Sequence, residues 1–144
     1  GRMRAVRCHE LVGPSGLCVD ALPEPEAGAG EAVIDVKAAG VNFPEVLLSY
    51  GKYQFKPTPP FVPGGELAGV VAAVGDGVSS LRVGDRVAAT MLHGAFAERV
   101  VVPELAAVAL PDAVSFETGA VTLLTYATTY HALVDRAAIP GPAR

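Results

Sequence analysis

Apolar and polar residues alternate along much of the first forty residues, which is the pattern of half-buried β-strands. Residues 3–10 and 17–22 are expected to form two strands, joined by the turn-forming residues 13–16. Residues 31–39 are expected to form a third strand with one apolar face and one charged face. The apolar face of this third strand would carry Ala32, Ile34, Val36 and Ala38.

Residues 61–87 combine glycine-rich turns with a continuous apolar run, and the rest of the chain is organised around this stretch. Residues 67–74 are apolar except for Gly69 and predict a buried strand. Glu66 stands directly before this strand, where an isolated charge would be costly to bury. Glu66 is therefore expected either to hold the glycine-rich turn as a structural residue or to belong to a site.

The chain after this stretch alternates again between short strands and turns. Strands are expected at residues 87–90 and 95–102, joined by a turn at 91–94. A helical turn at 104–106 and a short strand at 107–110 follow. The pattern of the whole chain thus predicts a mainly β fold with a few helices (α+β).

Two helices are expected within this β pattern. The first begins at Asn42, a good N-cap, with Glu45 three residues on as in a capping box, and ends at Gly51. The second begins at Ser115, whose hydroxyl is expected to cap it. Helical spacing in the first helix is shown by Phe43, Val46, Leu47 and Tyr50.

Composition narrows the classes of protein and partner. The 144 residues suit one domain, and the net charge of −4 without a Lys/Arg cluster argues against nucleic acid as a partner. No apolar run reaches the roughly 18 residues of a membrane span, so no membrane partner is expected. Cys8 and Cys18 match no zinc spacing and are read as reduced thiols of a cytoplasmic protein, with a cross-strand disulfide as the less favoured alternative.

Taken together, these segments resemble the N-terminal GroES-like catalytic domain of the medium-chain dehydrogenases/reductases, and within that superfamily the zinc-independent quinone oxidoreductase group. The matching motifs lie at residues 39–43, 51–53, 63–71, 83–87, 94–98 and 125–130. The resemblance implies a partly open β-barrel over residues 1–135, followed at 136–144 by a linker toward a Rossmann domain. No glycine-rich dinucleotide-binding motif occurs in the sequence, so the chain is expected to be a truncated catalytic half.

The sequence departs from the zinc-dependent branch of this superfamily at both metal-ligand positions. The branch places a cysteine and a histidine where this chain has Asn42 and Gly65, and neither residue supplies a thiolate or an imidazole. The four-cysteine loop of that branch is also missing. His93 is expected to be a solvent-facing turn residue that cannot replace these ligands. The resemblance therefore implies a site without metal.

In the zinc-free group, a hydride passes from NADPH to a quinone or an activated C=C bond, and the protein orients the reactants and stabilises the oxygen that gains charge. The resemblance implies that Asn42 contacts substrate or nicotinamide, that Tyr53 lies near the substrate carbonyl, and that Thr125 and Thr129 contact the cofactor. The competing roles are an N-cap for Asn42, a cleft-covering aromatic for Tyr53 and helix capping for Thr125. NADPH is expected to bind this chain alone weakly or not at all.

Other functions remain open from the sequence. One is an enoyl reductase acting on acyl thioesters, which shares this domain. Another is a stand-alone GroES-like module that binds a small apolar ligand or a partner protein without catalysis. The partner is expected to be a small apolar substrate such as a quinone or enone. A homo-oligomer is also expected, because an apolar patch would be exposed where the missing domain docks.

Overall fold

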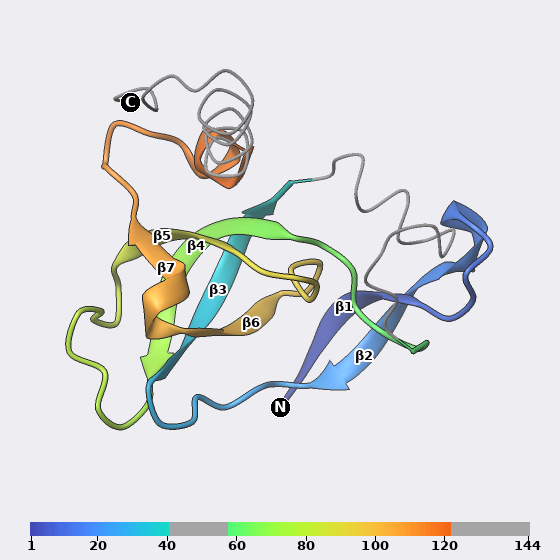
Figure 1. Cartoon of the computed structure of the whole chain (residues 1–144), viewed down its shortest axis with the longest axis horizontal. Helices are drawn as coiled ribbons and strands as arrows, with labels where there is room; N and C mark the ends of the chain where they lie inside the picture. Colours follow the sequence, from blue (N-terminus) through green and yellow to red (C-terminus); the bar gives the residue numbers. More distant parts are fainter. Residues whose placement is uncertain (41–57, 122–144) are drawn as a thin grey trace, which may run out of the picture.

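The computed structural model describes residues 1–40 and 58–121, which form a five-stranded antiparallel sheet and a separate hairpin (Figure 1). The strands of the sheet lie in the order β6-β3-β4-β5-β7. They are β3 (Glu31–Ala39), β4 (Glu66–Val74), β5 (Arg86–Thr90), β6 (Arg99–Pro103) and β7 (Ala107–Ala109). Among the described strands the sheets do not close, which confirms the mainly β, partly open arrangement expected from the sequence.

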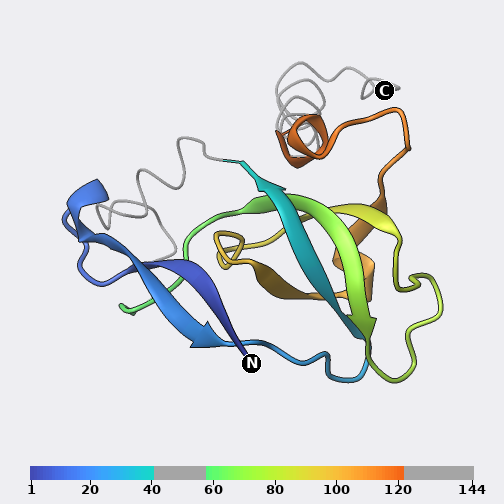
Figure 2. The ribbon, with the colours of Figure 1, turned by 180° about the vertical axis from the view of Figure 1, so that it is seen from behind.

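The hairpin consists of β1 (Arg2–Cys8) and β2 (Leu17–Pro23), joined through the 3-10 turn η1 (Pro14–Gly16). It lies beside the five-stranded sheet in both views of the ribbon (Figure 1 and Figure 2). A second 3-10 turn, η2 (Glu104–Ala106), connects β6 with β7 and confirms the helical turn predicted there.

The segment before β6 joins the hairpin to the sheet. Val6 donates its backbone N–H to the carbonyl of Phe96 at 2.8 Å, and Glu98 donates to the carbonyl of Arg4 at 3.0 Å. The sequence predicted one strand over residues 95–102, and this is wrong for 95–98. Ala97 bridges to Ala5 of β1 instead, Ala95 donates its backbone N–H to the carbonyl of Gly64, and pairing with β3 as a ladder starts only at Arg99.

The main core is built from aliphatic side chains of the sheet strands, together with Leu81 and Ala95 from the loops. Its largest fully buried members include Ile34, Leu67 and Val71. The predicted placement of Ala38 on the same face as Ile34 is wrong. A register shift between Val36 and Ala38 reverses the alternation, because a bulge inserts one extra residue into the strand. Ala38 therefore packs on the opposite face, against a second small cluster.

Gly69 interrupts the apolar run of β4 for a steric reason. A Cβ at this position would lie 2.2 Å from the carbonyl oxygen of Asp35 on the neighbouring strand β3. The two backbones lie so close here that no side chain fits between them, and only glycine can occupy such a position. The only non-apolar position in the run is thus explained by the pairing of β3 with β4.

A helix begins at Phe116 and lies over the end of the sheet where β3 ends and β4 begins (Figure 1). The hydroxyl of Ser115 accepts the backbone N–H of Thr118 at 3.1 Å, which confirms the predicted N-cap. Ala120 is buried against Ala68 and Ala88 on the outer face of the sheet. The helix predicted from Asn42 lies outside the described residues.

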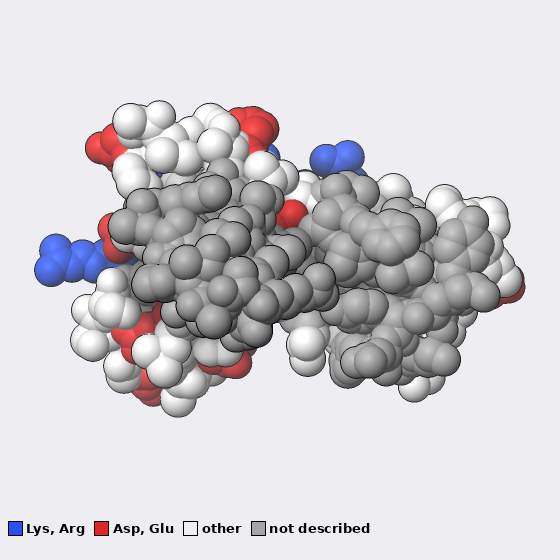
Figure 3. All heavy atoms as spheres, turned by 45° about the horizontal axis from the view of Figure 1, so that its top comes forward, with Lys and Arg blue, Asp and Glu red and all other residues white. Residues whose placement is uncertain are grey.

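Charged side chains are dispersed on the face drawn in Figure 3, where the described Lys and Arg residues stand apart rather than gathering in one patch. Several large apolar side chains of the described residues are exposed, with Leu105 at 96% and Leu92 at 72%. Within residues 1–40 and 58–121 no helix has the length and apolar character needed to cross a membrane.

Candidate functional site

The end of β3, the start of β4 and the end of β5 lie side by side at one end of the sheet. The sequence motif that contains Asn42 follows the end of β3. The register pairs Ala39, the last residue of β3, with Leu67, and pairs Glu66, the first residue of β4, with Thr90 at the end of β5. When strand ends lie side by side at one end of a sheet, the loops that follow them start close together. Asn42 follows two residues after Gly40, which directly follows β3.

The carboxylate of Glu66 is buried at this end of the sheet, and only 2% of the residue is exposed. Its side chain packs over Gly40, so closely that a Cβ on Gly40 would lie 2.1 Å from Oε1 of Glu66. The backbone N–H of Gly40 donates to the carbonyl of Glu66 at 3.1 Å. Of the two roles open from the sequence, the structural one gains a defined contact, because Glu66 holds the point at which the chain leaves β3.

The turn before Glu66 is locked by backbone hydrogen bonds to the segment after β5. The carbonyl of Gly64 accepts from Ala95 at 3.1 Å, and the carbonyl of Gly65 accepts from Met91 at 2.8 Å. Gly64 has a φ of +106°, and a Cβ there would lie 2.7 Å from the ring of Phe96. Both the conformation and the close contact require glycine at this position.

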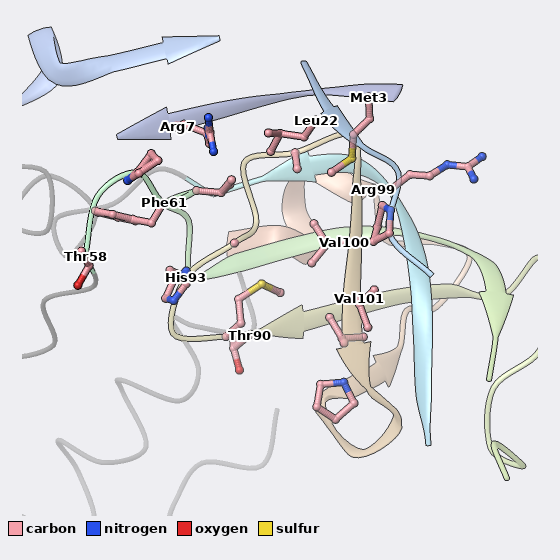
Figure 4. Close-up of a pocket in the computed structure, with 18 residues that line it drawn as sticks. Met3, Arg7, Leu22, Thr58, Phe61, Thr90, His93, Arg99, Val100 and Val101 are labelled. Atoms are coloured by element: carbon pink, nitrogen blue, oxygen red, sulfur yellow. The ribbon is translucent and has the colours of Figure 1, made fainter. Parts of the chain in front are cut away.

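A cavity of about 580 Å³ lies between the hairpin and β6 and extends to the end of β5 (Figure 4). Met3 and Leu22 reach it from the hairpin, while Val101 reaches it from β6. Phe61 and His93 line it near the strand ends described above. Its volume lies in the range of pockets that bind small molecules.

His93 and Phe61 form an aromatic pair in the wall of this cavity. Their ring centroids are 5.9 Å apart and their planes are inclined at 73°, an edge-to-face arrangement. Phe61 is itself held by Cys8, because the two residues exchange backbone hydrogen bonds of 2.7 and 3.2 Å. The prediction of a solvent-facing His93 is therefore wrong, since the ring packs partly buried against Phe61.

The two arginines that line the cavity are each compensated by a carboxylate. Arg7 donates from Nε to Oδ2 of Asp20 at 2.8 Å, and Arg99 lies 3.7 Å from Oε2 of Glu24. The hydrogen bond from Arg7, followed by one from His9, holds the pKa of Asp20 below its ordinary value. The part of the cavity wall formed by the described residues therefore carries little uncompensated positive charge.

Arg86 anchors the loop that leads into the last described helix. Its guanidinium donates to the carbonyls of Pro111 and Val114, both at 2.7 Å, and its Cζ lies 4.4 Å from the centre of the Phe116 ring. A planar guanidinium is suited to such combined hydrogen bonding and stacking. The Arg86 side chain is only 24% exposed, so these contacts fix where the helix begins.

The residues predicted to carry the chemistry all lie outside the described residues: Asn42, Tyr53, Thr125 and Thr129. The structure brings together the strand ends from which the first two lead. It also places the start of the helix segment that precedes the last two. Sequence reasoning missed Phe61 and Arg86, because their partners lie far away along the chain and no local pattern indicates them.

Both cysteines are free thiols, in agreement with the reduced state expected from the sequence. Cys8 pairs with Leu17 and Cys18 with Arg7, so the two cysteines are not opposite one another in the hairpin. Burial raises the pKa of the Cys8 thiol, which makes it a poor nucleophile. Within the described parts of the chain, no three His, Cys, Asp or Glu side chains gather as a metal-binding group would require.

Comparison with known proteins identifies relatives of the chain. Residues 28–112 match the family described as the alcohol dehydrogenase GroES-like domain. The chain is 39% identical to a quinone oxidoreductase-like protein 2 homolog from Nematostella vectensis over 140 residues, covering 96% of the chain and 38% of the relative. It is 37% identical to human quinone oxidoreductase over 141 residues, covering 95% and 42% of the two chains.

A solved structure shares the fold. The quinone oxidoreductase from Thermus thermophilus, which was also solved in complex with NADPH, superposes with a TM-score of 0.82 at 40% identity. The match covers 96% of this chain and 42% of the Thermus protein. The chain thus spans about two fifths of the length of the relatives it matches.

Proposed function

The chain belongs to the alcohol dehydrogenase GroES-like domain family of the medium-chain dehydrogenases/reductases, and from this membership we propose that it forms the catalytic part of an NADPH-dependent oxidoreductase that works without zinc. The proposed substrates are quinones or activated C=C bonds. We further propose that the GroES-like domain extends over residues 1–135.

One observation carries the metal-free reading. Gly65 occupies the position directly before Glu66 where the zinc-dependent branch, by resemblance, has a histidine. Glycine offers no side-chain donor, and its carbonyl already accepts the N–H of Met91 at 2.8 Å. The names of the human and Thermus relatives support the quinone reductase assignment, and the NADPH complex of the Thermus protein supports the choice of cofactor.

The chain's own residues would orient the electron acceptor and stabilise its oxygen. A nicotinamide held by the complete protein would supply the hydride, and a proton from solvent would complete reduction of a quinone to a hydroquinone. The Asn42 amide would donate a hydrogen bond to the oxygen that gains negative charge. Tyr53 would lie beside the substrate carbonyl, while the hydroxyls of Thr125 and Thr129 would contact the cofactor.

Two contacts within the described residues support the proposed positions of Asn42 and Thr125. Gly40, clamped by Glu66, sets the direction in which the chain leaves β3 two residues before Asn42. Arg86 sets the start of the helix segment that precedes Thr125. Preorganised donors contribute most when rigid elements hold them. Gly40 and Glu66 are buried, and the Arg86 side chain is only 24% exposed.

The experiment that tests the proposal is an Asn42→Asp exchange in the native protein that contains this chain. Aspartate caps a helix as well as asparagine does, but it cannot donate the hydrogen bond and repels a developing negative charge. We expect the rate of NADPH-dependent quinone reduction to fall roughly 100- to 1,000-fold while the melting temperature is kept. Retention of full activity would show that Asn42 only caps the helix and would refute the catalytic role.

A matched control is available because the chain has one other carboxamide side chain, Gln54. Gln54→Glu makes the same amide-to-carboxylate change at a position for which no contact with substrate or cofactor is proposed, so it is expected to leave the rate largely unchanged. An equal loss of activity in both variants would point to a general electrostatic effect rather than to a donor at position 42.

A further inference from the structure

The cavity along β6 is built mainly from apolar side chains that the proposed chemistry does not use. Met3, Leu22 and Pro25 line it from the hairpin side. Val101 and Pro103 line it from β6, and Figure 4 shows Met3 and Leu22 on one side of the cavity with Val100 and Val101 on the other. Such a lining favours an apolar ligand group, because apolar area removed from water stabilises the bound state.

Two uncharged polar side chains of the cavity wall lie near the candidate site. Thr90 and His93 line the end of the cavity next to the last residue of β5, and Thr90 pairs with Glu66 in the sheet. Glu66 in turn packs over Gly40, which precedes Asn42 by two residues. A ligand whose polar head lies at this end would thus extend its remainder along β6.

Charge decides what kind of tail fits the remainder of the cavity. Among the described residues, Arg7 and Arg99 are the cationic side chains in its wall, and each has a carboxylate partner, Asp20 at 2.8 Å and Glu24 at 3.7 Å. Because each guanidinium is already compensated, a tail that ends in a carboxylate would gain little from them. The cavity therefore favours an uncharged tail.

A polypeptide strand is a less suitable occupant than a small molecule. β6 is an edge strand of the sheet, but it has only five residues and ends in Pro103, which has no backbone N–H to donate. Short edges that carry proline resist the addition of a further strand.

We propose that this cavity binds the uncharged apolar tail of the substrate, so that the substrate class is a quinone or enone carrying an alkyl or prenyl chain. The proposal rests on the function proposed above and specifies its substrate. The head lies at the Thr90 and His93 end, and the tail lies between Leu22 and Val101. Affinity then depends on chain length, because each buried methylene contributes a similar increment.

The test measures dissociation constants of the native protein for a series of 2-alkyl-1,4-benzoquinones, from methyl to decyl, by calorimetry. We expect the dissociation constant to fall roughly fourfold for each of the first several methylenes and then to level off once the cavity is filled. The heat-capacity change should become more negative along the series, as burial of apolar surface requires. A dissociation constant that does not change with chain length would overturn the proposal.

Filling the cavity gives the second arm of the test. In Val101→Phe, the dissociation constant should no longer depend on chain length, because the larger side chain fills the space for the tail. Leu22→Phe, from the opposite wall, is an independent variant with the same expected result. Val108→Phe is the matched control, because Val108 is 51% exposed on β7, the other edge strand, and does not line the cavity. Chain-length dependence that survives both cavity variants would contradict the assigned location.

Two further outcomes separate this inference from the proposed function. If the methyl compound is reduced with NADPH but affinity and kcat/KM do not change along the series, the tail site fails and the function stands. If affinity rises with chain length while no member is reduced, the tail site stands and the function fails. Decanoate binding as tightly as the decyl quinone would indicate an anion site and would also overturn the proposal.

Discussion

Replacement of Gly40 by alanine tests whether Glu66 clamps the chain where it leaves β3. A Cβ at position 40 would lie 2.1 Å from Oε1 and 2.6 Å from both Cδ and Cγ of Glu66. Rotation of the terminal carboxylate alone cannot relieve a contact that includes Cγ. The side chain would have to shift as a whole, although only 2% of the residue is exposed.

The expected magnitude follows from two opposing effects. Overpacking of a filled interior costs about 1–3 kcal/mol, while replacement of glycine by alanine stabilises by about 0.4–1 kcal/mol through the unfolded state. The overpacking effect is larger, so Gly40→Ala should lower the free energy of unfolding by about 1–2 kcal/mol. For a domain of this size the melting temperature should fall by roughly 3–8 °C.

Urea unfolding followed by circular dichroism measures this difference, and a double-mutant cycle isolates its cause. In a Glu66→Ala background the clashing atoms are absent, so Gly40→Ala should become neutral or stabilising there. Gly28→Ala is the matched control, because its Cβ would come within 3 Å only of Oε1 of Glu31, at 2.8 Å, which a small rotation can move. Equal destabilisation by Gly40→Ala in both backgrounds would refute the clamp.

Two further exchanges test anchors elsewhere in the fold. Arg86→Lys should lower the free energy of unfolding by about 1–3 kcal/mol, since one ammonium cannot replace the bonds to Pro111 and Val114, whereas the exposed Arg82→Lys should change it by less than about 0.5 kcal/mol. Equal urea midpoints for the two variants would contradict the role of Arg86. Hydrogen bonds from the side chain and backbone of Ser80, and from the backbone of Ser79, lower the pKa of Glu104 from its ordinary value of 4.5. The ionised Glu104 therefore stabilises the fold at neutral pH, and this stabilisation is lost as the pH falls through the lowered pKa. Glu104→Gln should therefore lower the urea midpoint at pH 7, and its midpoint should approach that of the wild type as the pH falls below the lowered pKa of Glu104. The exposed Glu26→Gln is the control, and a difference from the wild type that does not depend on pH would contradict the role of Glu104.

Local sequence pattern predicts most of the strands because alternation and turn glycines are short-range signals. β3 spans the predicted residues 31–39, and η2 spans the predicted 104–106. The errors arise where partners distant in the sequence decide the outcome. Residues 96–98 bond to β1, which lies far away along the chain, and a bulge opposite β4 turns Ala38 to the other face.

The candidate site divides in the same way. The sequence identifies Glu66 as a residue in need of a partner, because a charge before an apolar strand is a local contradiction. It does not reveal Gly40 as the residue beneath its side chain, nor Phe61 as the partner of His93. Asn42, Tyr53, Thr125 and Thr129 rest on family resemblance, and their roles stay predictions.

Under the proposed function, hydride transfer in the native protein needs no metal. The most direct measurement is the rate of NADPH-dependent quinone reduction by the native protein before and after exhaustive dialysis against a strong chelator. An unchanged rate, with no increase when zinc is added back, is the predicted result because Gly65 and Asn42 offer neither imidazole nor thiolate. Loss of the rate on chelation and its recovery with zinc would contradict the account.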